Sequence, residues 1–158
     1  TKQELKIMIG YYDITTTLKN ALLQDTNVNT VTKGGTDMVD VVKQSMFPLS
    51  HISVDTVTHE NPALRFSVSI ELLDIIDINK DATVDEFRGN DNEDDILNTQ
   101  LAVGLRLIER LRRGRLFTSD IQLEGGASFE PIHNQYENGL SGWRLTFDIM
   151  YNHDMTIC

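Results

Sequence analysis

Between Asn92 and Arg113, apolar residues recur at intervals of three and four positions, which is the spacing of one face of an α-helix. The predicted apolar stripe, with Gly104 inside it, consists of Leu97, Leu101, Leu105, Ile108 and Leu111. Asn92 is predicted to cap the free amides of the first turn, and Gly114 to end the helix. At about 1.5 Å per residue the helix is roughly 30 Å long, and we expect its apolar face to pack on a β-sheet.

Charged residues of opposite sign stand at the two ends of this predicted helix. The acidic end consists of Asp91, Glu93, Asp94 and Asp95. The basic end consists of Arg106, Arg110, Arg112 and Arg113, and Arg115 follows. Both groups suit the helix dipole, because acidic side chains stabilise a helix N-terminus and basic side chains a C-terminus. The two ends also complement each other, so we predict that they form a subunit interface in a head-to-tail assembly.

The N-terminal segment predicts a second helix, from about residue 3 to residue 24, with a break near Asp13. Further along, Ile52 to Thr58 and Phe66 to Leu72 each alternate apolar and polar residues, which is typical of half-buried strands. Asn61-Pro62-Ala63 lies between them and suits a chain reversal. These two segments are therefore predicted to pair as an antiparallel hairpin.

Three further segments have the pattern of strands. Asn27 to Thr32 predicts a short strand, and Leu116 to Leu123 predicts another, which ends at a turn formed by Gly125-Gly126. Residues 133–141 are polar and are expected to be a loop. The last strand, from Trp143 to Tyr151, carries bulky apolar residues at every second position, and we place it centrally beneath the long helix.

Two segments, residues 33–49 and 77–91, have the composition of extended arms, and within the first of them Thr36 to Lys43 suits a strand or an arm. The whole pattern predicts a single α+β domain over residues 1–158. Its mainly antiparallel sheet is covered by the long helix (about 92–113), and the N-terminal helix (about 3–24) completes the fold.

Composition narrows the possible functions. With 158 residues, of which 40% are hydrophobic and 24% charged, the chain suits one globular domain. The formal charge of −10 argues against a protein that binds nucleic acid, but it is compatible with a channel through which DNA passes without sticking. Cys158 is the only cysteine, which excludes an intramolecular disulfide. No apolar run reaches the ~18–20 residues of a membrane span. We expect a protein that is made and kept inside a cell.

Two acidic segments contain side chains that could ligate a metal ion. Asp77 to Asp85 begins like a calcium-binding EF-hand loop, but Ala82 replaces the required glycine and Arg88 the required glutamate, so a solvated turn is the better interpretation. The acidic helix end has the carboxylates for a magnesium ion. Helix capping explains those carboxylates without a metal, and no metal site is predicted.

Residues with catalytic chemistry do not assemble into a recognisable motif. The histidines, at positions 51, 59, 133 and 153, are scattered over predicted loops and strand ends. The sequence contains no nucleophile elbow, phosphate-binding loop or dinucleotide-binding glycine pattern. We therefore predict a structural or binding protein that has no enzymatic activity and needs no cofactor.

Three stretches of the chain resemble small neck and tail proteins of tailed bacteriophages, above all the tail-terminator or tail-completion proteins. They are Met46 to Ile52, Asp91 to Thr99, and the last part of the sequence, which runs from Asn138-Gly139-Leu140-Ser141-Gly142-Trp143 to Asn152–Cys158. The resemblance implies a ring, typically six-fold with twelve-fold as the other option, at the head-proximal end of the tail tube. Such a ring stops tube growth, joins tail to head with portal, neck or tube proteins as partners, and surrounds a channel for DNA. It implies assembly in the host cytoplasm and a final location in the virion.

Two other functions remain open from the residues alone. One is a small metal-dependent enzyme that uses Asp91, Asp94 or Asp95 with a histidine. The other is a monomeric ligand-binding module with an apolar pocket.

Overall fold

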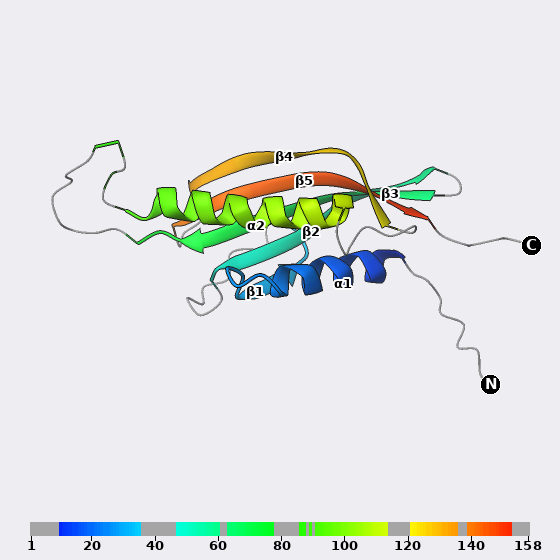
Figure 1. Cartoon of the computed structure of the whole chain (residues 1–158), viewed down its shortest axis with the longest axis horizontal. Coiled ribbons are helices and arrows are strands. Elements are labelled where there is room, and N and C mark those ends of the chain that lie inside the picture. The colour runs from blue at the N-terminus through cyan, green and yellow to red at the C-terminus, as the bar shows by residue number, and fades with distance from the viewer. Residues whose placement is uncertain are drawn as a thin grey trace, which may run out of the picture.

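The computed structural model describes residues 10–35, 47–60, 63–77, 86–87, 89, 91–113, 121–135 and 139–152. Within these ranges the chain forms two helices and five strands (Figure 1). The helices are α1 (Gly10–Leu23) and α2 (Glu93–Arg113), and the strands are β1 (Thr30–Lys33), β2 (Leu49–Glu60), β3 (Ala63–Ile75), β4 (Ile121–Gln135) and β5 (Leu140–Asn152). The predicted single α+β domain, with the long helix packed on the sheet, is confirmed.

The five strands form one mixed sheet in the order β1-β2-β3-β5-β4. All neighbouring strands are antiparallel except β1 and β2, which are parallel. The carbonyl oxygen of Pro48 accepts hydrogen bonds from the N–H groups of Asn29 (2.9 Å) and Thr30 (3.2 Å), which aligns the starts of these two strands. The strand predicted at residues 27–32 is observed as β1, which begins three residues later and ends one residue later than predicted.

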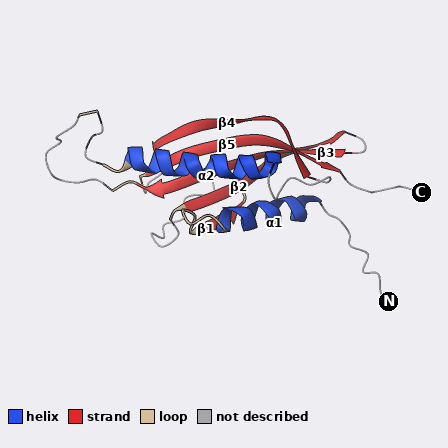
Figure 2. Cartoon of the chain, in the orientation of Figure 1, coloured by secondary structure: helices blue, strands red, loops and turns tan. Residues whose placement is uncertain are grey.

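Both helices lie on the same face of the sheet (Figure 2). Their apolar side chains share one core with alternate residues of the strands beneath them. From the helices this core includes Ile14, Leu18, Leu22, Val103, Leu107 and Leu111, and from the sheet Phe66, Val68, Ile70, Leu72, Leu145, Phe147 and Ile149. Since consecutive strand residues point to opposite faces, the other half of each strand faces away from the helices.

The predicted hairpin and the predicted last strand are confirmed. β2 and β3 pair antiparallel, with Ile52 opposite Ile70. β5 lies between β3 and β4, inside the sheet and beneath α2, as its run of bulky residues indicated. Trp143 of this strand donates a hydrogen bond from Nε1 to the carbonyl oxygen of Leu97 (2.7 Å), which joins the sheet to α2.

The predicted break in the first helix is wrong. α1 continues through Asp13 without interruption, whereas residues 3–9 of the predicted helix lie outside the described residues. Asp13 stands in the first turn, where a carboxylate suits the helix dipole. Its Oδ2 also accepts a hydrogen bond from the Tyr151 hydroxyl (2.8 Å), so this residue anchors α1 to the sheet.

The bounds of α2 match the prediction, but its buried face is rotated. The buried residues are Ile96, Gln100, Val103, Gly104, Leu107, Ile108 and Leu111. Leu105, predicted in the stripe, is 48% exposed. Gly104 explains the rotation, because a Cβ atom there would lie 2.6 Å from Cε1 of Phe129 and 3.1 Å from Cδ1 of Leu72. The helix therefore approaches the sheet on its glycine side.

The predicted turn at Gly125-Gly126 is wrong. β4 runs through both glycines, and its pairing with β5 shifts register between Glu124 and Ser128. Gly125 has a φ of 70°, which a bulge requires as readily as a turn does. Most residues of the predicted loop at 133–141 belong instead to the end of β4 or the start of β5. Pro131 is tolerated because β4 is an edge strand.

Other predictions fall largely outside the described part of the chain. This holds for most of both predicted arms, for the EF-hand-like loop after Asp77, and for His153 and Cys158. Of the residues that are described, neither helix is long and apolar enough to cross a membrane.

Candidate interface surfaces

At the basic end of α2, Arg106 is held by a residue of the same chain. Its Nε and Nη2 donate hydrogen bonds to the two carboxylate oxygens of Asp25, at 2.7 and 2.9 Å. Burial raises the pKa of Asp25, but the hydrogen bonds from Arg106 and from the N–H of Asn27 outweigh it and hold this pKa below 3.8. The hydrogen bonding to Asp25 in turn raises the pKa of Arg106. Arg106 thus fastens α2 to the turn after α1.

Arg110 has a similar internal role. Its Nη1 donates to the carbonyl oxygen of Ala21 (3.1 Å), in the last turn of α1, where carbonyl groups lack helical partners. Arg112 and Arg113 are exposed, and within the described ranges no ion pair involves either of them. Of the four arginines predicted at an interface, these two are therefore positioned to meet a partner.

The acidic end of α2 is divided in the same way. Glu93 Oε1 pairs with Nδ1 of His133 on β4 at 2.5 Å, and its Oε2 accepts a hydrogen bond from the hydroxyl of Ser141 on β5 (3.3 Å). These contacts join the first turn of α2 to both strands. Asp94 and Asp95, in contrast, are exposed.

Asp91, and not Asn92 as predicted, caps the first turn. Asp91 Oδ1 accepts a hydrogen bond from the N–H of Glu93 (3.2 Å). Asn92 instead accepts a hydrogen bond on Oδ1 from the N–H of Asp77 (2.6 Å). In the described part of the chain, no group of three or more His, Cys, Asp and Glu residues is arranged to hold a metal ion.

Sequence reasoning missed a third surface, the face of the sheet opposite α1 and α2, which we call the helix-free face. One row of side chains crosses all five strands on this face. In strand order it consists of Thr32, His51, Glu71, Arg144 and Glu130.

The buried members of this row are held by hydrogen bonds. His51 is 1% exposed, and its Nδ1 lies 2.7 Å from the hydroxyl of Thr32, while its Nε2 lies 3.0 Å from the carbonyl oxygen of Gly35. Glu71 is also 1% exposed and accepts a hydrogen bond from Nη2 of Arg144 (2.7 Å). The sequence placed His51 in a loop or at a strand end, without these partners.

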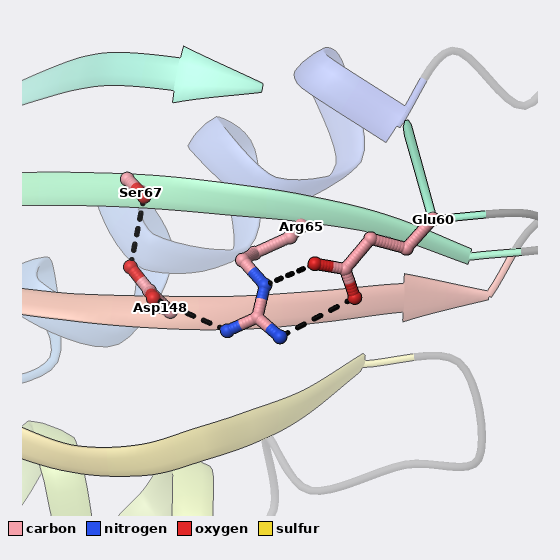
Figure 3. A network of polar contacts seen from close by, with 4 residues as sticks. All are labelled: Glu60, Arg65, Ser67 and Asp148. Carbon is pink, nitrogen blue, oxygen red and sulfur yellow. Dashed lines mark hydrogen bonds and ion pairs between the residues drawn. The ribbon is translucent and has the colours of Figure 1, made fainter. Parts of the chain in front are cut away.

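A second charged network lies on the same face, toward the β2–β3 hairpin. Figure 3 shows Arg65 between Glu60 and Asp148. Arg65 donates from Nε and Nη2 to Glu60 (2.8 and 3.3 Å) and from Nη1 to Asp148 (3.4 Å). Ser67 donates to the other oxygen of Asp148 (2.9 Å). The hydrogen bond that Arg65 donates to Glu60 is the main cause that raises the pKa of Arg65.

Acidic groups predominate on the helix-free face. Of the described residues there, two are arginines, Arg65 and Arg144. The exposed or half-buried carboxylates are Asp55, Glu60, Glu124, Glu130 and Asp148, whereas Glu71 is buried in its pair with Arg144. Glu124 and Glu130 are exposed on the edge strand β4. The alternate polar positions of each strand were visible in the sequence, but the summed charge depends on which strands pair.

No family model matches the chain, and no curated protein matches its sequence.

Proposed function

We propose that this chain is a structural protein of a tailed-phage virion. It forms a ring at the neck, at the top of the tail, where it ends the tail tube and joins tail to head around a channel for DNA. The protein has no enzymatic activity in this role. Its partners are further copies of itself and the portal, neck or tube proteins above and below the ring.

One observation carries the proposal: surfaces of opposite charge lie on different layers of one domain. Arg112 and Arg113 are exposed at the end of α2, in the helix layer, and the acidic helix-free face lies on the far side of the sheet. A surface that complements a different surface of the same molecule produces head-to-tail contacts, and such contacts close into a ring when the rotation permits.

The net charge also supports a channel. At a formal charge of −10 the protein repels phosphate groups, so DNA can pass through the ring without being retained. We place the excess carboxylates both at the contacts between copies and along the channel wall.

Light scattering of the purified protein at low and moderate salt tests the proposal. We expect a closed multiple of 17.9 kDa, with about six or twelve copies from the symmetry of such rings, and a larger assembled fraction at low salt. A strictly monomeric mass at both salt concentrations, up to the highest concentration the protein tolerates, contradicts the ring.

Charge exchange tests which surfaces meet. The double variant Arg112→Glu/Arg113→Glu is expected to lose the ring while its melting temperature is unchanged. Adding Glu124→Arg and Glu130→Arg to that variant is expected to restore assembly, because each contact again joins opposite charges. Loss without restoration contradicts the pairing of these two surfaces.

A further inference from the structure

A groove runs between α1 and the strands β1 and β2. It consists of two adjoining hollows with volumes of about 300 and 460 Å³, which share Thr15, Lys33 and Ile52 as lining residues. Volumes of this order accommodate a few side chains of a bound peptide.

Exposed aromatic rings stand at one end of this groove. Tyr11 is 40% and Tyr12 62% exposed, and the two rings meet edge to face with centroids 6.0 Å apart. The ammonium group of Lys33 lies 5.2 and 5.9 Å from their centroids. Val57, which lines the larger hollow, is 49% exposed. Tyrosines that present both a flat apolar ring and a hydroxyl are typical anchors of protein–protein contacts.

The groove is basic in an otherwise acidic protein. Both lysines of the described residues, Lys19 and Lys33, line it. One carboxylate, Asp55, stands at its edge and accepts a hydrogen bond from the Ser69 hydroxyl. A chain with a formal charge of −10 thus gathers two cations and two exposed aromatic rings in one place, which favours an acidic peptide with an aromatic side chain.

We infer that this groove binds the acidic segment 81–87 of a second copy of the chain. That segment contains three acidic residues and no basic residue. Its aromatic residue, Phe87, is 92% exposed and follows Asp85 and Glu86 in the sequence. The ring suits the apolar side of the groove, and the flanking carboxylates suit Lys19 and Lys33.

The position of this segment indicates that it binds the groove of another molecule. Residues 86–87 lie at the end of the domain where α2 begins, and α1 begins at the opposite end (Figure 1). A contact between segment and groove therefore joins two copies head to tail. It goes beyond the charge pairing proposed above, since neither the exposed arginines nor the edge-strand carboxylates Glu124 and Glu130 take part in it.

Cross-linking between two differently tagged versions of the full chain tests this inference. Both versions carry Cys158→Ser, one also carries Thr16→Cys in the wall of the groove, and the other Arg88→Cys next to Phe87, so that the tyrosines and Phe87 are kept. A short bismaleimide is expected to join the two versions into a heterodimer. Leu105→Cys replaces Thr16→Cys in the matched control, because Leu105 is also an exposed helix residue, on α2 and away from the groove.

Charge reversal in the groove provides the second arm. Lys19→Glu/Lys33→Glu, introduced into the Thr16→Cys version, is expected to lower the heterodimer yield about tenfold, which corresponds to the loss of roughly 1.4 kcal/mol of binding energy. Equal yields with the Leu105→Cys control, or a yield that the reversal leaves unchanged, would overturn the inference. Melting temperatures of all versions verify that each is folded.

Light scattering of the same proteins separates this inference from the proposed ring. A ring that persists without the cross-link overturns the groove contact and leaves the ring in place. A specific cross-link in a protein that never exceeds a dimer supports the groove contact and contradicts the ring.

Discussion

Arg106 donates two hydrogen bonds to the carboxylate of Asp25, a residue 81 positions earlier in the chain, and so ties α2 to the end of α1. Two parallel hydrogen bonds between a guanidinium and a carboxylate fix the orientation of both groups, which makes such a contact geometrically specific. Asp25 is nearly buried, with 8% of its side chain exposed, whereas Arg106 is 46% exposed. The contact therefore belongs to the stability of the fold and not to the surface offered to a partner.

Substitution should separate the structural arginine from the exposed ones. Arg106→Ala is expected to lower the free energy of unfolding by about 1 kcal/mol, because it leaves the Asp25 carboxylate without its guanidinium partner. Arg112→Ala is expected to leave stability unchanged within about 0.5 kcal/mol and to weaken assembly. Urea denaturation measures the first effect and light scattering the second. Equal stability of the two variants would contradict the structural role of Arg106.

The same ion pair should make the protein sensitive to acid. Because the folded state holds the pKa of Asp25 below 3.8, ionised Asp25 contributes stability that is fully present above pH 3.8. That contribution is lost as the pH falls from 3.8 through the lower pKa of the folded state. Asp25→Asn should therefore destabilise the protein at pH 7 and converge with the parent in acid. A stability difference that is the same at pH 7 and pH 2.5 would speak against this origin.

Asp74 on β3 should behave in the opposite way. Its burial raises its pKa above 3.8, and the hydrogen bond from the N–H of Ile75 only partly offsets that effect. Folding thus favours the protonated carboxyl group, and this contribution is present below pH 3.8 and lost as the pH rises through the raised pKa. Asp74→Asn is expected to gain about 0.5 kcal/mol at pH 7, since an amide oxygen can accept the same hydrogen bond. Thermal unfolding between pH 3 and pH 7 measures the gain, which must shrink toward low pH.

Elements that have one regular spacing of apolar residues along their whole length could be predicted from the sequence. The β2–β3 hairpin followed from alternation in segments such as Phe66 to Leu72, and the bounds of α2 from its charged ends. Gly125 shows where such signals are ambiguous, because a positive φ serves a turn and a bulge equally well. Only the neighbouring strand β5 decides between them, and that pairing is a long-range property.

The candidate surfaces were predictable only in part, for the same reason. The charges at the ends of α2 are visible in the sequence, but their division into internal and exposed residues depends on Asp25 and His133, which come from distant segments. The helix-free face depends on the four pairings that join the five strands. Likewise, Leu105 is exposed and Gln100 is buried because Gly104 determines which side of α2 approaches the sheet.

Gln100 is the clearest departure from the sequence pattern, and it leads to a prediction about stability. It lies on the buried face of α2 and is 1% exposed. Among the described residues neither its Nε2 nor its Oε1 has a hydrogen-bond partner. A buried amide without partners costs about 1–3 kcal/mol. Methionine has a similar length and flexibility without the amide, so Gln100→Met should remove that cost and keep the packing.

We expect Gln100→Met to raise the free energy of unfolding by about 1–2 kcal/mol, which corresponds to roughly 2–8 °C in melting temperature for a domain of this size. Gln122→Met on β4 is the matched control, because the same change at an exposed position removes no buried amide and should alter stability by less than about 0.5 kcal/mol. Differential scanning calorimetry of the three proteins measures both effects. A lower melting temperature for Gln100→Met would show that the amide makes a stabilising contact, and would contradict its role as a buried cost in the core.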